Sequence, residues 1–186
     1  MNKSLKASMI VCSVGEIISL VYTKYGDEIR SSEQGLAIIG NAEGCSRTPY
    51  KCPADVITVG IGSTEAGGQK IDPRHKYSDQ EIARRWVDDI KTAEQCVNRY
   101  ENGKNMPQGA FDAMTSITFN VGCENMRNST LFKLAKTGYS DALCDQFPLW
   151  VYAGGKKLKG LEIRRAKERA LCLGGTRGSE IFLRWL

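Results

Sequence analysis

The chain has 186 residues, enough for one domain with a substantial hydrophobic core. Its composition, 41% hydrophobic and 25% charged, is typical of a soluble protein, and its net charge of +5 favours anionic partners. The positive charges are dispersed without long Lys/Arg runs, which argues against nucleic acid as a partner. His75 is the only histidine, so His-rich metal sites are excluded, and we expect neither a metal nor a cofactor.

The cysteines are numerous for this length, and their spacing indicates disulfides rather than a metal site. They are Cys12, Cys45, Cys52, Cys96, Cys123, Cys144 and Cys172. None is part of a Cys-x-x-Cys pair, the spacing usual in zinc sites. A dispersed set is typical of a protein that folds outside the reducing cytoplasm. Because seven is odd, at least one thiol stays outside the intramolecular disulfides or pairs between chains.

The N-terminus resembles an export signal, because Lys3 and Lys6 precede an apolar stretch over residues 7–22. This stretch is shorter than the ~20 residues that span a bilayer, and it contains Glu16, which is costly in hydrocarbon. We therefore predict a marginal membrane anchor over residues 1–24 that inserts and can later leave the bilayer. The lysines would keep the N-terminus cytoplasmic and the rest outside. A cleaved signal peptide and a buried soluble helix are the alternatives.

Residues 25–33 are polar and charged and are predicted to link the anchor to a domain over 34–175. Ser31-x-x-Gln34 is a capping-box pattern, which predicts a helix that ends near Gly40–Gly44.

An acid, Glu43, lies at the end of this predicted helix. A Pro-Tyr turn and the β-branched run 56–59 follow, and Gly-Ile-Gly ends that run. We therefore expect a small hairpin sheet with Glu43 at its mouth and with Cys52 and Thr58 opposite the acid. An acid that faces short hydrogen-bonding or nucleophilic groups across a cleft suits glycosidic hydrolysis.

The rest of the domain is predicted to be helical. Ser78-x-x-Glu81 caps a long helix over residues 79–100, which would join the sheet lobe to an all-helical lobe. The further predicted helices cover 107–122, 129–137, 140–147 and 162–173. The tail over 176–186 is apolar, and no role is assigned to it.

The spacing around Glu43 resembles the catalytic segment of phage lysozymes of glycoside hydrolase family 24. Eight residues separate Glu43 from Cys52 and five separate Cys52 from Thr58, with Gly60 and Gly62 following. Most members have Asp at the Cys52 position, and the segment is most similar to the cysteine-bearing signal-arrest-release endolysins. The resemblance covers about residues 34–173 and includes a second segment, WVYAGGKKLKGLEIRRAKERALCL.

This resemblance implies an α+β, lysozyme-like fold with a small antiparallel sheet lobe joined by a long helix to a mostly helical lobe. It implies a monomeric endolysin that cleaves the β-1,4 bond between N-acetylmuramic acid and N-acetylglucosamine of peptidoglycan, with inversion and without a cofactor. The enzyme would face the periplasm from the host inner membrane and then be released into the periplasm.

The resemblance also assigns roles to residues. Glu43 would be the general acid, which must hold a proton near neutral pH, and Thr58 would hydrogen-bond the attacking water. Cys52 remains open among water-orienting group, base and nucleophile, or it is a plain disulfide partner. The cleft would also contain three residues that contact or order the substrate site: Tyr50, Asn120 and Arg165. Arg165 lies where the family places an arginine near the catalytic acid, and Arg164 is the less favoured alternative to it.

Each assignment has a plain structural alternative. Thr58 favours strands in any case, the Asn120 amide suits a helix end, and Arg165 fits a solvated helix face.

Two structural disulfides are predicted from the helix order. Cys144 and Cys172 lie on successive short helices joined by the Gly-Gly loop, so an antiparallel pair would bring them together. This pairing leaves Cys96 with Cys123.

The remaining cysteines suggest a regulatory exchange. A Cys45–Cys52 disulfide would block the catalytic thiol while the membrane holds Cys12 away. After release, Cys12 would attack Cys45 and free Cys52.

Other functions remain open for this sequence. A Cys52–His75 peptidase or amidase and a lytic transglycosylase are the rival enzymes, and a disulfide-stabilised wall-binding module is the non-enzymatic rival.

Overall fold

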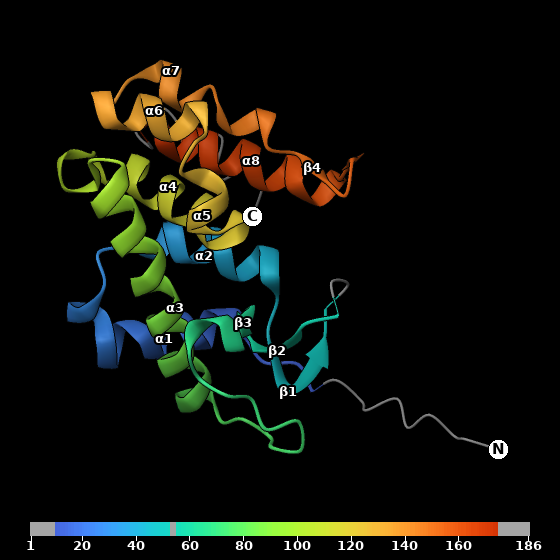
Figure 1. The fold of residues 1–186 in the computed structure, drawn as a ribbon. Coiled ribbons are helices and arrows are strands. Elements are labelled where there is room, and N and C mark those ends of the chain that lie inside the picture. The colour runs from blue at the N-terminus through green and yellow to red at the C-terminus, as the bar shows by residue number, and fades with distance from the viewer. Residues whose placement is uncertain (1–9, 53–54, 175–186) are drawn as a thin grey trace.

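The computed structural model describes residues 10–52 and 55–174 (Figure 1). The predicted tail over 176–186 and the first part of the predicted anchor lie outside these residues. The helices are α1 Val14–Tyr25, α2 Glu33–Glu43, α3 Asp79–Tyr100, α4 Gln108–Val121, α5 Cys123–Met126, α6 Thr130–Thr137, α7 Asp141–Cys144 and α8 Lys159–Cys172. The strands are β1 Ser46–Lys51, β2 Ile57–Gly60, β3 Ser63–Thr64, β4 Tyr152–Ala153 and β5 Lys156–Lys157.

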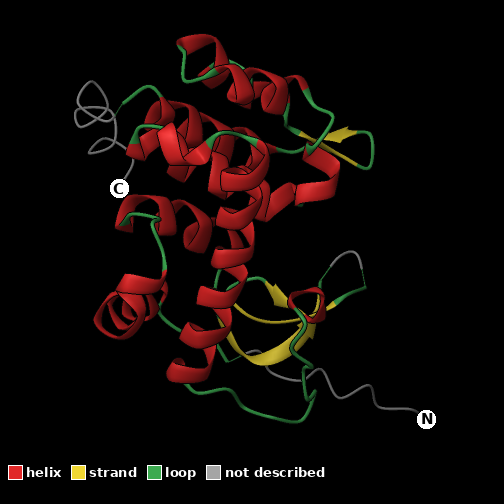
Figure 2. Ribbon diagram, turned by 60° about the vertical axis from the view of Figure 1, so that its left-hand side comes forward, coloured by secondary structure: helices red, strands yellow, loops and turns green. Residues whose placement is uncertain are grey.

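The long helix α3 connects two lobes, as the sequence predicted (Figure 2). Its start is fixed by the complete capping box of Ser78 and Glu81, which satisfies two backbone N–H groups that a helix end leaves without partners. Its first half packs Trp86, which is fully buried, into a core with α1, α2 and the sheet. Its second half packs Val97 into another core, formed by α4 to α8. The predicted α+β architecture, a small antiparallel sheet lobe joined by a long helix to a mostly helical lobe, is confirmed.

The three-stranded sheet is antiparallel in the order β1-β2-β3. Tyr50 pairs with Thr58, and Thr58 pairs with Thr64 on its other side. Directly paired residues project to the same face of a sheet, so Tyr50 and Thr58 share one face. Gly60 ends β2 with φ of 63°, and a Cβ there would approach Ile82 of α3 to 2.9 Å. Only glycine lets the sheet lie this close to α3.

Helix α2 starts one residue later than the sequence predicted, because Ser32 and not Ser31 caps it. The Ser32 hydroxyl accepts from the Gly35 N–H at 3.3 Å. Ser31, the predicted cap, instead donates to Glu94 of α3 at 2.7 Å. Asp112 of α4 accepts from both the Ser32 N–H and its hydroxyl. Hydrogen bonds to Glu94 and Asp112, which are far away in the sequence, therefore determine that Ser32 and not Ser31 is the N-cap.

Differences from the predicted elements are concentrated in the C-terminal lobe. Helix α8 begins at Lys159, three residues before the predicted start. The Gly-Gly segment before it forms the β4–β5 hairpin, with both glycines at positive φ. The short helix α5, directly after α4, had no signal in the sequence analysis.

Helix α1 lies within the protein core in this structure. Ser13 caps it, and Ile17 and Val21, one turn apart, are buried against the first core. The polar residues Glu16, Ser19 and Thr23 are exposed on the other side. In the described part of the chain, no helix is both long and apolar enough to cross a bilayer.

All seven cysteines lie among the described residues, and six of them form disulfides. Cys96–Cys123 joins the end of α3 to α5, and Cys144–Cys172 joins α7 to the end of α8. Both pairs match the sequence prediction. Each closes a loop of nearly thirty residues, which contributes about 3–4 kcal/mol of stability in the chain-entropy model. The third disulfide is Cys12–Cys45, which ties the segment before α1 to the segment after α2.

A buried carboxyl group at the end of α3 makes stability depend on pH. Glu101 is fully buried, neither carboxyl oxygen has a hydrogen-bond partner among the described residues, and desolvation raises its pKa to about 9. Because the unfolded chain releases this proton near its ordinary pKa, stability falls as pH rises from about 5 to 9, by up to roughly 1.4 kcal/mol for each pH unit. Glu101→Gln should remove this contribution, so its midpoint of urea unfolding should decline less between pH 5 and pH 8.

The exposed carboxylate Glu124 provides the matched control, since it is 80% exposed and forms an ion pair with Arg127. Glu124→Gln should follow the wild-type stability curve. Equal pH slopes for wild type and Glu101→Gln would contradict the assignment of a neutral buried Glu101.

Candidate active site

Glu43 is the last residue of α2, and the backbone around it leaves room for its carboxyl group. Gly44 leaves the helix with φ of 73°. Gly62, in the turn between β2 and β3, has φ of 70°, and a Cβ there would lie 3.2–3.3 Å from the Glu43 side chain. Glycine is therefore required at both positions: Gly44 lets the chain turn away from the helix, and Gly62 leaves room for the Glu43 carboxylate. The Glu43 side chain is 25% exposed, which leaves it accessible to a ligand.

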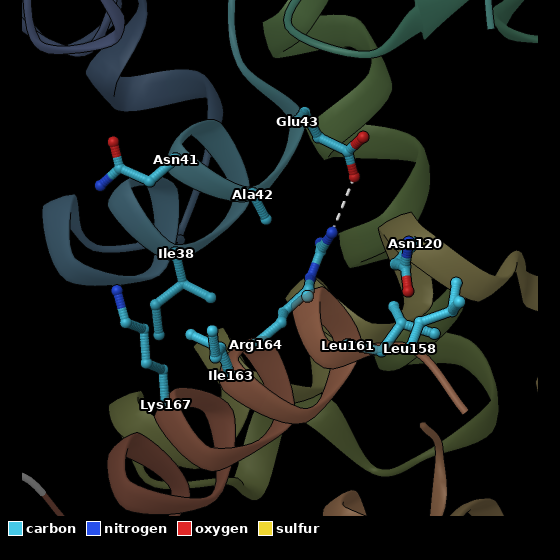
Figure 3. Close-up of a pocket in the computed structure, with 11 residues that line it drawn as sticks. Ile38, Asn41, Ala42, Glu43, Asn120, Leu158, Leu161, Ile163, Arg164 and Lys167 are labelled. Atoms are coloured by element: carbon cyan, nitrogen blue, oxygen red, sulfur yellow. Dashed lines mark hydrogen bonds and ion pairs between the residues drawn. The ribbon is translucent and has the colours of Figure 1, made fainter. Parts of the chain in front are cut away.

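An arginine from α8 holds the Glu43 carboxylate. The Arg164 guanidinium donates from Nη1 to Glu43 Oε1 at 2.7 Å, across 121 residues of sequence (Figure 3). The Arg164 side chain is only 4% exposed, so this ion pair is largely shielded from water.

The expectation that Arg165 would be the arginine at Glu43 is therefore wrong. Neighbouring residues project about 100° apart around a helix, so only one of the two can reach α2. The Arg165 side chain turns instead to Asn120 of α4, to Glu168 and to the Trp150 carbonyl oxygen. Arg165 still orders the site, because Asn120 is one of the pocket residues.

The sheet brings Tyr50 to the acid. Burial raises the pKa of Tyr50, and the nearby negative charges of Glu43 and Cys52 raise it further. The tyrosine is therefore within electrostatic reach of both groups.

Cys52 and Thr58 are linked through hydrogen bonds to one backbone carbonyl oxygen. The Val56 carbonyl oxygen accepts from the Cys52 N–H at 3.0 Å and from the Thr58 hydroxyl at 3.1 Å. Thr58 is buried, and its oxygen can still accept a further hydrogen bond. Tyr50, Cys52 and Thr58 thus lie together at one end of the sheet, where Tyr50 is within electrostatic reach of Glu43.

A pocket of about 430 Å³ opens beside the ion pair, between the end of α2 and the start of α8 (Figure 3). It combines apolar walls with a few polar groups, as ligand sites commonly do. Its lining is Ile38, Asn41, Ala42, Glu43, Asn120, Leu158, Gly160, Leu161, Ile163, Arg164 and Lys167. Of these, Glu43, Asn120 and Arg164 were candidates from the sequence, and the others were not predicted.

The histidine of the rival peptidase hypothesis has a partner at the start of α3. His75 Nε2 lies 2.9 Å from Glu81 Oε1, and its ring packs edge-on against Tyr77. Among the described residues, no group of three or more His, Cys, Asp or Glu side chains is arranged to hold a metal ion.

A partly buried acid that is paired with an arginine beside a pocket is an arrangement that suits acid catalysis, and comparisons with known proteins show to which class the chain belongs. The phage lysozyme family model matches residues 40–168. The chain is 40% identical to the SAR-endolysin of Escherichia phage P1 over 185 residues, covering 94% of this chain and 97% of that one. It is 37% identical to the SAR-endolysin of Haemophilus phage HP1, covering 94% and 100%.

Solved structures agree with these sequence matches. The active form of P1 phage endolysin Lyz superposes with a TM-score of 0.82 at 40% identity, covering 90% of this chain and 97% of that one. The secreted inactive form of the same protein gives a TM-score of 0.56 at 41% identity and covers 78% and 97%. The chain belongs to the phage lysozyme family. It is an endolysin with muramidase activity, and its substrate is peptidoglycan.

Proposed function

We propose that Glu43 is the general acid that protonates the leaving oxygen of the glycosidic bond. The observation that carries this proposal is the placement of its two carboxyl oxygens. Oε1 accepts from Arg164, whereas Oε2 lies on the side of Gly62. Oε2 is therefore the oxygen that can hold and donate the proton, while Arg164 keeps the group aimed at the substrate.

The attacking water would bind on the sheet side, between Glu43 and Cys52. Thr58 can accept from this water, and Tyr50 can hydrogen-bond either the water or the sugar. Cys52 occupies the position from which most relatives of this kind present a carboxylate. A thiol is the weaker base unless its pKa is lowered, so we propose that Cys52 chiefly orients the water. Attack from the face opposite the acid inverts the anomeric centre.

We further propose that α1 belongs to a segment that lies in the membrane before activation. Its two faces support this. Ile17 and Val21 need an apolar environment, which either the core or lipid provides. Glu16, Ser19 and Thr23 are exposed in the fold and would be costly in hydrocarbon. When α1 moves from the bilayer to the protein core, its polar face therefore becomes hydrated, which removes the free-energy cost of keeping it in hydrocarbon. Its apolar face stays buried.

The names of two relatives, the SAR-endolysins of phages P1 and HP1, support this proposal of a membrane-bound form that is later released. The enzyme would be tethered to the host inner membrane, face the periplasm and then be released into it. It would act as a monomer, since the acid, its arginine and the pocket all come from one chain.

Activation would proceed by thiol–disulfide exchange. The Cys12 thiol loses its proton to solvent, and the thiolate attacks Cys45 of a Cys45–Cys52 disulfide. The Cys12–Cys45 bond forms, the old bond breaks, and Cys52 leaves as a thiolate, with no net oxidation. The Cys12–Cys45 disulfide of the present structure is the bond that this step would form, which supports the proposal. The higher TM-score with the active form of the P1 endolysin, 0.82 against 0.56, supports an active arrangement.

Product analysis tests the proposed reaction. Purified peptidoglycan is digested with the released enzyme, and the fragments are assayed for reducing ends and weighed by mass spectrometry. We expect new reducing N-acetylmuramic acid ends. An anhydro-sugar would indicate a transglycosylase, new amino groups a peptidase, and an undigested wall a binding module, and each would contradict the proposal.

A further inference from the structure

A fully buried carboxylate, Glu168, lies behind the active site on α8. Its side chain has 0% exposure. Oε1 accepts from Arg164 Nε at 3.1 Å and from the Ser116 hydroxyl at 2.6 Å, and Oε2 accepts from Arg165 Nη1 at 2.8 Å. A carboxylate buried without water is stable only when its oxygens are satisfied in this way. One acid thus binds two adjacent arginines.

Each of these arginines reaches a different residue of the pocket. Arg164 uses its remaining nitrogens on Glu43 and on the Ser116 carbonyl oxygen, at 2.7 and 3.0 Å. Arg165 uses its remaining nitrogens on Asn120 and on the Trp150 carbonyl oxygen. All three nitrogens of each guanidinium group donate a hydrogen bond, and these bonds fix the orientation of both arginine side chains. The orientation of both pocket groups therefore depends on the same buried acid.

We infer that Glu168 is a positioning residue for the reaction, which aligns the acid Glu43 and the amide Asn120 through two arginines and balances their charge. The inference rests on the proposed role of Glu43 as general acid. Glu168 itself touches neither substrate nor the reacting atoms.

The charge balance is the second part of its role. Among the described residues, Arg164 and Arg165 from α8 and Tyr50 from β1 interact with Glu43, and Cys52 in turn interacts with Tyr50. With Glu168 present, two guanidinium groups face two carboxylates.

Without Glu168, both positive charges would act on Glu43 alone and favour its ionised form. An ionised Glu43 cannot protonate the leaving group. Burial lowers the pKa of Arg165, and the Glu168 carboxylate opposes that effect.

The test is the pH dependence of turnover on purified peptidoglycan, measured with the released full chain. Glu168→Gln keeps the shape and the acceptor oxygen but removes the charge. We expect turnover at pH 7 to fall about tenfold. The alkaline limit of activity, which is the pH at which turnover falls to half its maximum on the alkaline side, should move about one pH unit lower. The KM should change less than turnover, because the substrate contacts remain.

Glu94→Gln is the matched control, because Glu94 is another buried carboxylate that accepts several hydrogen bonds, here from Arg30 and Ser31. It should lower the melting temperature without moving the pH profile. Ser116→Ala serves as a milder second variant, since it removes the bond to Glu168 and a longer bond from Arg164 Nη2 at 3.3 Å but keeps all charges. It should lower turnover severalfold and leave the alkaline limit in place.

Two results would overturn the inference, and a third would overturn the proposed function. A folded Glu168→Gln whose alkaline limit matches that of wild type overturns it. If Glu168→Gln does not fold, an unchanged turnover in Ser116→Ala overturns it. Activity retained by Glu43→Gln would overturn the proposed acid instead, and that failure is distinguishable, because it appears in a variant with Glu168 intact.

Discussion

Glu43→Gln is expected to lose at least about 1,000-fold in turnover while keeping its fold. General acid catalysis contributes typically 10²–10⁴-fold, and glutamine has no acidic proton to give. Its side-chain oxygen can still accept from Arg164, so the contact with α8 and the melting temperature should be preserved. The release of reducing ends from purified peptidoglycan measures the loss.

Glu33→Gln is the matched control, since Glu33 lies at the other end of the same helix and is exposed. It should retain wild-type turnover. If Glu43→Gln stays within tenfold of wild type, Glu43 is not the acid.

The second large effect is expected from Cys12→Ser. In this variant the Cys45–Cys52 disulfide has no internal attacking thiol, so the released protein should remain inactive until a reductant is added. Cys45→Ser should behave in the opposite way and be active while still tethered, because Cys52 can no longer be blocked. Lysis timing in cells, and activity of the separated membrane and soluble fractions, measure both.

A double variant of Cys144 and Cys172 is the control for general loss of disulfides. It removes a bond on the far side of the helical lobe and should lower stability without altering the order of release and activation. Lysis by Cys12→Ser on the normal schedule would contradict the exchange.

Local signals in the sequence were sufficient for much of the fold. The capping box at Ser78, the glycine at the end of α4 and the glycine after Glu43 each set a helix boundary through groups close in sequence. The two structural disulfides followed from helix order. These features depend on short-range geometry, which the sequence expresses directly.

Features decided by contacts far apart in sequence were not predictable in the same way. Arg164 and Arg165 are chemically identical neighbours, and the rotation of α8 against α4 and α2 decides which one reaches Glu43. Ser31 and Ser32 were equivalent candidates for a cap until Glu94 and Asp112 engaged them.

Two missed features had a local signal or a spacing that was present in the sequence. Adjacent glycines, Gly154 and Gly155, are typical of a tight hairpin turn and predict the β4–β5 hairpin. Glu168 follows Arg164 by four residues and Arg165 by three, which are the spacings of ion pairs on a helix. The complete burial of Glu168, on which its proposed role depends, could be seen only in the structure.

The most direct test of the account is the partner of Cys45 before and after release. Tethered and released protein would be trapped with a thiol-alkylating reagent, digested without reduction and mapped by mass spectrometry, and the activity of each fraction would be recorded. The account predicts Cys45–Cys52 in the tethered, inactive chain and Cys12–Cys45 in the released, active chain. Cys12–Cys45 in the tethered chain, or Cys45–Cys52 in a released chain that digests peptidoglycan, would contradict it.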